Sequence, residues 1–347
     1  MNNTNQRFGT QQSAAVSRQR RKSQLGLTLV ELLVALVIST VVVVAAFSAL
    51  IVSRQGFTAT DSASQLRDNA RFLTDLIQRI GVQAGYLDYK FAVTPISNAS
   101  SVASIPEPDV KGFNNALANA TAPDINFTSR GASSVDGSDV LVLRYQASET
   151  YPGSGVLDNS MVSCNGSPAQ SLPVNRNDRV RNVFHIAVST TDNEPSLMCS
   201  TYNTSTGAID TQPIIRGVET FQVLYGVDGV TPNTALPATL ANTSNIPTRY
   251  LRADQMVVAG NADETNRNWG RVRSLLVGMV IRGAAGSAPE NAAMTYYPFG
   301  PAPGSPTGGK GSAMASANDP GTEFKPPSDN RLRQVVTFVV HLRNGQD

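Results

Sequence analysis

Glu31 is a single acid at the start of the longest apolar stretch of the chain. The sequence from Gln24 reads QLGLTLVELLVALVISTVVVV, and the next charged residue after Glu31 is Arg54. A carboxylate at the centre of a membrane helix is unfavourable by about 2.5–3.5 kcal/mol, and by less near the end of the helix. The acid therefore needs a partner, and a charge pair in a low-dielectric environment would supply one.

The chain has two cysteines, Cys164 and Cys199. In an oxidising compartment they could form a disulfide, and closing the loop between them is worth about 4 kcal/mol in the chain-entropy model. Two unpaired, buried thiols are the alternative. We expect the disulfide, because the N-terminal segment described below directs the chain out of the cytoplasm.

No arrangement of residues in the sequence indicates catalysis or metal binding. His185 and His341 each lie opposite the more hydrophobic face of a predicted strand, so we expect both on the less buried side. No nucleophile-elbow motif accompanies them, and the cysteines and histidines lack the spacing of metal ligands. The sequence therefore predicts a protein that is not an enzyme and that needs neither a cofactor nor a metal.

Three further features have ordinary explanations. The Asp-Gly pair in Val227–Asn233 indicates a plain turn, since the downstream glutamate of an EF-hand is missing. The stretch GSPTGGKG, Gly304–Gly311, resembles a phosphate-binding loop but lacks the final Ser or Thr, so we interpret it as flexible linker. Trp269 is expected to be a half-buried structural residue and not an exposed anchor for a partner.

Basic residues are concentrated at the start of the chain. Arg7, Arg18, Arg20, Arg21 and Lys22 precede Gly26 without any acid, although the whole chain has 28 basic and 26 acidic residues. The rest of the chain is thus slightly acidic, and no nucleic-acid partner is expected. Basic residues before an apolar helix keep the N-terminus in the cytoplasm and send the rest across the membrane.

The apolar segment, residues 27–52, permits three interpretations. As a helix it would be about 39 Å long, enough to cross a bilayer. A cleaved secretory signal would have a shorter apolar core, and a plain membrane anchor would leave Glu31 unexplained. The third interpretation accounts for every feature: the basic leader, residues 1–26, is removed after Gly26, and Glu31 becomes the fifth residue of the mature chain.

The stretch GLTLVELLVALVIS resembles the class III signal of type IV pilins and the related pseudopilins. The resemblance rests on Gly26, an apolar residue at Leu27, Thr28, Glu31 and the apolar run that follows. It implies that a membrane aspartyl peptidase, the prepilin peptidase, cuts after the glycine and methylates the new N-terminus. It also implies that Glu31 pairs with the N-terminal amine of a neighbouring subunit when helices stack into a fibre.

The helical pattern continues beyond the membrane segment. Apolar residues recur at intervals of three and four, which is the spacing of one face of a helix: Leu66, Ala70, Leu73, Ile77, Ile80 and Ala84. We therefore expect one helix from Leu27 to about Tyr86, with Gly56 as its weakest point. Its amphipathic part, residues 53–86, would pack on a sheet with Phe72, Leu73 and Leu76 in the core.

Residues 87–347 are expected to form a β-rich head outside the cytoplasm. Six segments alternate or are solidly β-branched: 140–145, 183–188, 197–202, 218–227, 272–282 and 335–342. No regular helices separate them, so an antiparallel sheet in an α+β fold is expected. Long Gly-, Pro-, Ser- and Asn-rich loops are expected at 90–138, 146–180, 228–270 and 283–330.

Later blocks resemble PilW-type minor pilins of type IV pili. They are DNARFLTDLIQRIGVQAGY, SDVLVLRY, VETFQVLYGVD, NWGRVRSLLVGMVIRG and NRLRQVVTFVVHLRNGQ, in this order to the C-terminus. The resemblance implies a single-pass inner-membrane protein that later joins a pilus near its tip, with other minor pilins, the major pilin and a possible tip adhesin as partners. A J-type minor pseudopilin of a type II secretion system remains the alternative.

Overall fold

The structure is a computed structural model. It describes residues 26, 28–92, 107–118, 127–129, 137–189, 193–203, 208–237, 246–288, 294–300, 319 and 322–344. The chain divides into two compact parts, residues 1–54 and 55–347, and each is described by itself. The phosphate-loop-like stretch Gly304–Gly311 lies outside the described residues.

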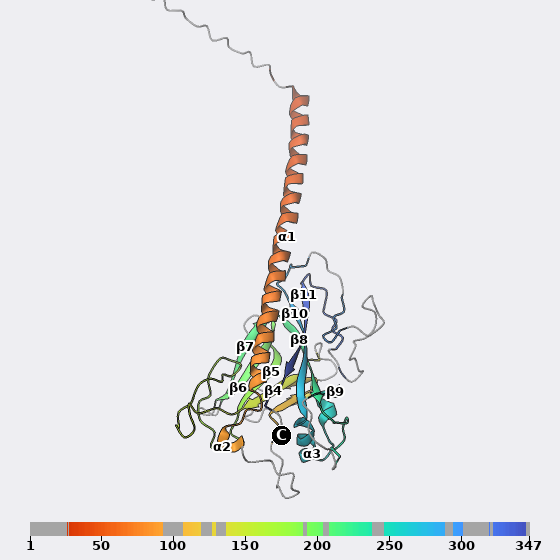
Figure 1. The fold of residues 1–347 in the computed structure, drawn as a ribbon. Coiled ribbons are helices and arrows are strands. Elements are labelled where there is room, and N and C mark those ends of the chain that lie inside the picture. The colour runs from red at the N-terminus through yellow and green to blue at the C-terminus, as the bar shows by residue number, and fades with distance from the viewer. Residues whose placement is uncertain are drawn as a thin grey trace, which may run out of the picture. The chain divides into compact units, whose positions relative to one another are not determined.

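The long helix α1 spans Leu29–Gln83, slightly inside the predicted range (Figure 1). Gly56 lies within it and does not interrupt it. The six residues of the predicted apolar stripe are all buried, from Leu66 to Ala84. Phe72 was wrongly expected in the core: its side chain is 52 % exposed, because it lies on the flank of the helix that faces away from the sheets.

The head contains two main sheets, and every strand pair in them is antiparallel. The first has the order β1 (Val110–Phe113), β4 (Val140–Tyr145), β5 (Val180–Val188), β6 (Pro195–Asn203) and β7 (Ala208–Arg216). The second has the order β11 (Arg333–His341), β10 (Val272–Arg282), β8 (Val218–Val227) and β9 (Arg249–Leu251). The predicted α+β fold with a long N-terminal helix and antiparallel strands is confirmed.

Short elements complete the head. β2 (Ala116–Ala118) pairs with β3 (Phe127–Ser129), and three short helices are α2 (Tyr89–Ala92), η1 (Ala253–Met256) and α3 (Ala262–Trp269). All six predicted strands exist, and three of them have the predicted bounds. β7 was not predicted because it contains Pro213, which cannot donate to a ladder; β7 tolerates it as an edge strand.

Asp139 joins the two main sheets. Its backbone N–H donates to the Phe221 carbonyl at 2.8 Å, and its carboxylate accepts from the Val223 N–H at 2.9 Å and from the Asn115 N–H at 2.9 Å. Asp139 directly precedes β4, while Phe221 and Val223 belong to β8. One buried carboxylate thus holds the start of a strand in the first sheet against a strand of the second.

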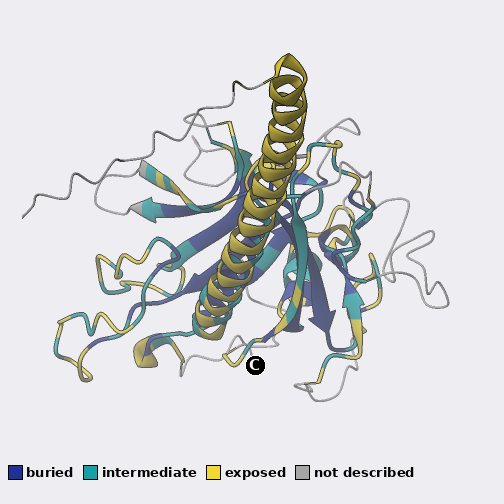
Figure 2. Ribbon diagram, turned by 90° about the horizontal axis from the view of Figure 1, so that it is seen from above, coloured by how far each residue is buried: buried dark blue, intermediate teal, exposed yellow. Residues whose placement is uncertain are grey.

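One hydrophobic core lies between α1 and the two main sheets. Figure 2 draws the buried parts of the ribbon in dark blue. It joins the stripe of α1 to side chains of both sheets, such as Phe184 and Phe221. A smaller cluster on the other face of the first sheet contains Ala116, Val140, Val142 and Val183. Because this second face is covered too, strands such as β4 are apolar at every position instead of alternating.

His185 was expected on the less buried side of its strand, and this is wrong. Its side chain is 5 % exposed, since β5 lies between β4 and β6 and both of its faces are covered. His185 Nε2 lies 3.0 Å from the Ser200 hydroxyl, which is buried as well. A substrate cannot reach this pair. His341 is exposed, as predicted, at the end of β11.

Trp269 is a structural residue, as predicted, but it is more deeply buried than expected. It ends α3 and is 3 % exposed. Its ring meets that of Tyr225 edge to face, with centroids 4.7 Å apart. As the only tryptophan of the chain, it is a natural fluorescence probe for unfolding of the head.

Gly81 of α1 packs directly against Val340 of β11. A Cβ atom added there would lie 2.4 Å from Val340 Cγ1. Alanine normally stabilises a helix by about 0.5–1 kcal/mol relative to glycine. Here we expect Gly81→Ala to destabilise the head by about 1–3 kcal/mol, because the added methyl overpacks the core. The measurement is denaturant unfolding of the full chain in detergent, followed by Trp269 fluorescence.

The matched control is Gly56→Ala in the same helix, where an added Cβ meets nothing within 4 Å. It should leave the unfolding midpoint unchanged or raise it. Adding Val340→Ala to Gly81→Ala should recover part of the loss, as expected for two residues in contact. A Gly81→Ala variant as stable as the wild type would contradict the overpacking.

Candidate functional site

The candidate processing and assembly site lies at the start of α1. Gly26 is exposed, and a Cβ added to it would meet nothing within 4 Å. Leu27, the other residue of the expected cleavage junction, lies outside the described residues. Thr28 directly precedes α1, and Glu31 lies in its first turn. Both side chains are exposed.

Thr28 and Glu31 form a capping box. The Thr28 hydroxyl accepts the Glu31 N–H at 3.3 Å, and Glu31 Oε2 accepts both the Thr28 N–H and the Thr28 hydroxyl at 3.2 Å. This reciprocal arrangement satisfies two backbone donors that a helix otherwise leaves unpaired at its N-terminus. The box was not predicted, although the sequence pattern Thr-x-x-Glu before an apolar run is the signal for it.

The box gives Glu31 a role before any neighbour is present. A carboxylate at a helix N-terminus is favoured by the helix dipole, and it has room for further hydrogen bonds because its two oxygens offer about four acceptor positions. The carboxylate of Glu31 is therefore held beside the expected cleavage junction with capacity for one more cationic partner. An amine is a chemically suitable partner for it.

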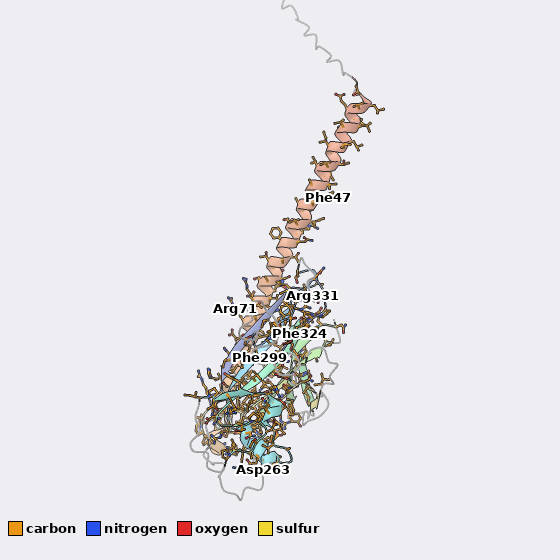
Figure 3. All side chains as sticks on the ribbon, turned by 90° about the vertical axis from the view of Figure 1, so that its right-hand side faces the viewer. Phe47, Arg71, Asp263, Phe299, Phe324 and Arg331 are labelled. Carbon is orange, nitrogen blue, oxygen red and sulfur yellow. A yellow bond between two sulfur atoms is a disulfide. The ribbon has the colours of Figure 1, made fainter. Side chains whose placement is uncertain are left out.

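The apolar part of α1 presents its large side chains to the surface. Its large side chains from Leu29 to Val52 are 47–76 % exposed, and Phe47, labelled in Figure 3, is 61 % exposed. Among the described residues, α1 is the one helix long and apolar enough to cross a membrane. Such a surface is stable in a lipid bilayer or against other apolar helices, and not in water.

The two cysteines are joined in a disulfide, as predicted, with Cα atoms 5.9 Å apart. Cys199 lies in β6, and Cys164 lies in the long loop that follows β4. The Cys164 N–H also donates to Asn182 Oδ1 at 2.7 Å. The bond therefore ties the loop to the first sheet. Within the described part of the chain, no group of three or more His, Cys, Asp or Glu residues could hold a metal ion.

A pair of buried carboxyl groups was not predicted. Asp139 and Asp319 are each 3 % exposed. The side-chain amide of Asn114 lies between them, and with its nitrogen turned toward the carboxyl groups it donates to Asp139 Oδ1 at 3.2 Å and to Asp319 Oδ1 at 3.0 Å. Burial raises the pKa of Asp319 to about 6. Burial, and then the charge of Asp319, raises the pKa of Asp139 well above its usual value. No local pattern predicts the pair, because Asp319 is 180 residues further along the chain in a Pro- and Gly-rich stretch.

These shifts predict how the stability of the head depends on pH. An unfolded aspartate titrates near pH 3.9, so the folded state holds extra protons between about pH 4 and pH 6. The stability that Asp319 contributes is complete below about pH 4 and is lost as the pH rises through about 6. The raised pKa of Asp139 gives a contribution that also falls as the pH rises. Hydrogen bonds from Lys90 and Arg333 lower the pKa values of Glu149 and Asp329, respectively. The stability that these two carboxylates contribute is lost as the pH falls below about 4.

We therefore expect the head to be most stable between about pH 4 and pH 6. Asp319→Asn should narrow the difference in unfolding free energy between pH 5 and pH 8 by about 1–1.5 kcal/mol, since about one unit of the raised pKa of Asp319 lies above pH 5. Unfolding of the full chain in detergent at the two pH values, followed by Trp269 fluorescence, measures it. Asp158→Asn, a change in an exposed loop, is the control. An unchanged difference in the Asp319 variant would contradict the assignment.

The helix α3 was also missed, since residues 228–270 were expected to be a loop. Asn261 caps α3 by accepting the Glu264 N–H at 3.1 Å, and Asp263 and Glu264 lie in its first turn. An Asn cap followed by acids is a known start signal for a helix. The turn at Val227–Asn233 is confirmed: Gly229 has φ +70° and Asp228 forms an ion pair with Arg271 at 3.5 Å.

Two family models match separate parts of the chain. Residues 183–344 match a family described as type IV pilus-assembly protein W, and residues 21–47 match the prokaryotic N-terminal methylation motif. No curated protein matches the chain. Among solved structures, a type IV-like pilin from Thermus thermophilus is similar at 12 % identity and a TM-score of 0.34, over 81 % of this chain and 98 % of that one.

Proposed function

We propose a role in pilus assembly for this chain, from the premise that it is a minor pilin of the PilW type. In this proposal the prepilin peptidase removes residues 1–26 and methylates the new N-terminus at Leu27. The methylation motif over residues 21–47 supports this step. So does the exposed position of Gly26 next to a capped helix start.

Before assembly, the protein is anchored in the inner membrane by residues 27–52, with its N-terminus in the cytoplasm and its head outside. The exposed apolar surface of α1 from Leu29 to Val52 supports the anchor. The basic residues before Gly26 support the orientation. The disulfide between Cys164 and Cys199 supports an oxidising location for the head.

Assembly transfers the apolar helix from lipid to a bundle of pilin helices. There the carboxylate of Glu31 pairs with the N-terminal amine of a neighbouring subunit. The capping box supports this, because it holds the carboxylate at the helix start while leaving acceptor positions free. A misregistered subunit would leave a charge unpaired in a low-dielectric environment, so the pair also selects the correct register.

The chain primes assembly at or near the tip, together with other minor pilins, and it can support a tip adhesin. The size of the head supports this position. A head with two main sheets and long loops fits more easily at the end of a fibre than along it, where repeated subunits must pack tightly. A J-type pseudopilin of a secretion system is less well supported, since the family match over residues 183–344 is to a pilus-assembly protein.

The observation that carries the proposal is the combination of the exposed apolar part of α1, from Leu29 to Val52, with a capped acid at its start. The experiment compares pili sheared from cells that lack the gene with pili from the same strain complemented by the wild-type gene. We expect surface pili to fall sharply in the deletion strain and to return on complementation. Unchanged pili together with lost export of secreted proteins would instead establish the secretion role.

A further inference from the structure

β11 is an edge strand with one side of its backbone unpaired. It is the first strand in the order of the second sheet, and among the described strands it pairs with β10 alone. The Leu342 N–H donates to the Arg273 carbonyl in line with this ladder. Because backbone groups alternate along a strand, the even-numbered residues of β11 face β10 and the odd-numbered ones face away from it.

Four successive outward positions are Val335, Thr337, Val339 and His341. Within the described part of the chain, their backbone N–H and C=O groups make no hydrogen bond. The other sheet edges are blunted: β1 and β9 are short, and β7 contains Pro213. A long edge without proline is a template for pairing with an added strand. β11 has nine residues and is such an edge.

A groove runs between this edge and α1. The last part of α1 lies beside β11 (Figure 3). Gly81 lies against Val340, and the Asn344 side chain donates to the Val82 carbonyl at 2.8 Å. The groove near the start of β11 is lined by Arg67, Ala70, Arg71, Thr74, Asp75 and Gln334. An added strand at the β11 edge would therefore place alternate side chains against the helix.

The charged side chains that line the groove favour a strand with an acidic residue. Arg67 and Arg71 are exposed, and within the described part of the chain neither side chain has an ion pair or a hydrogen-bond partner. Arg282 at the end of β10 and Arg333 at the start of β11 are already paired, because both form ion pairs with Glu219. Asp75 lies one turn beyond Arg71, so an incoming carboxylate is favoured beside the two free arginines and disfavoured further along.

We propose that the outer edge of β11 is the docking site for an extended strand of another pilus subunit, with a carboxylate directed at Arg67 and Arg71. The strand adds to the second sheet through the outward backbone groups of β11. Its register is set by the two arginines at one end of the groove and by Asp75 next to them. The identity of the partner as a pilus subunit rests on the function proposed above.

The test is photo-crosslinking in cells that make the full chain with a photoreactive benzoylphenylalanine at position 339. The crosslinked peptide is identified by mass spectrometry in membranes and in sheared pili. The reference position is Val174, which is 84 % exposed in a loop away from β11. We expect position 339 to crosslink to an extended, acid-containing segment of another pilin, and position 174 to give no such product.

Two variants test the mode of binding. Val335→Pro removes one outward N–H and leaves the ladder with β10 intact, since proline is tolerated at such edge positions. We expect it to lower the crosslink about tenfold, as for one lost hydrogen bond. Val335→Thr keeps the N–H and should not lower the crosslink. The double change Arg67→Glu and Arg71→Glu should lower it at least as much, whereas Arg79→Glu on the same helix should not.

The proposal is overturned by any of four results. These are no crosslink at position 339, a crosslink only to this same chain within one subunit or between two copies, a crosslink to a segment without an acid, and a crosslink unaffected by Val335→Pro. Restoration of pili by the wild-type gene is scored in the same strain. Failure of that restoration counts against the pilus function, while the crosslink result decides separately whether β11 accepts a strand.

Discussion

Serine at position 26 is expected to leave this protein at precursor length. In the proposed function, the peptidase requires a residue without a side chain directly before the cut. Even a small side chain there is therefore expected to block cleavage. The substitution should not disturb the rest of the chain, because a Cβ atom at position 26 meets nothing within 4 Å. Loss of the mature form, which lacks residues 1–26, is measured by mass spectrometry of the membrane fraction.

The control is Gly56→Ser, which puts the same side chain at another open glycine of α1. That variant should be processed like the wild type. A mature-sized product from Gly26→Ser would contradict cleavage at this junction. Pili should be reduced in the Gly26→Ser strain as strongly as in the deletion strain, since an unprocessed helix lacks the N-terminal amine.

Changing Glu31 should abolish most incorporation into pili while leaving membrane insertion and cleavage intact. Two roles of the side chain must be separated, because Glu31 both caps α1 and is proposed to pair with a neighbour's amine. Glu31→Ala removes both. Glu31→Gln keeps an oxygen for the capping box but removes the charge. Thr28→Ala weakens the cap and keeps the charge.

The charge pair predicts a specific order of effects. Glu31→Ala and Glu31→Gln should both reduce the protein in sheared pili by at least about tenfold, since breaking a buried pair by removing one partner costs about 3–5 kcal/mol. Thr28→Ala should cost about 0.5–2 kcal/mol of helix stability and reduce incorporation less. The measurement is the ratio of this protein to major pilin in sheared material, at equal amounts of mature protein in the membrane.

The opposite order would point to the cap. If Glu31→Gln is incorporated normally while Thr28→Ala and Glu31→Ala both fail, the acid acts within its own helix and the pairing with a neighbour is refuted. If all three variants are recovered in sheared pili in the same amount as the wild type, Glu31 has no role in assembly.

The elements that the sequence determined are those with a local physical signal. The stripe from Leu66 to Ala84 repeats at helical spacing, and every one of its six residues is buried. The strands at 140–145, 218–227 and 272–282 have the predicted bounds, because runs of β-branched and aromatic residues between turn residues mark them. The long helix was predicted from Leu27 and begins at Leu29, and the single acid Glu31 marks the candidate assembly site.

The tertiary structure decided what depends on residues far apart in the chain. The strands divide into two sheets joined at Asp139, and the cover on the second face of β5 buries His185 against the expectation from alternation. Alternation reports only the hydrophobicity of one strand, whereas burial depends on what packs over it. Asp319 reaches Asp139, and the unpaired edge of β11 meets α1, only in the folded chain. Such contacts carry no local pattern, because their partners are brought together by the packing of the whole head.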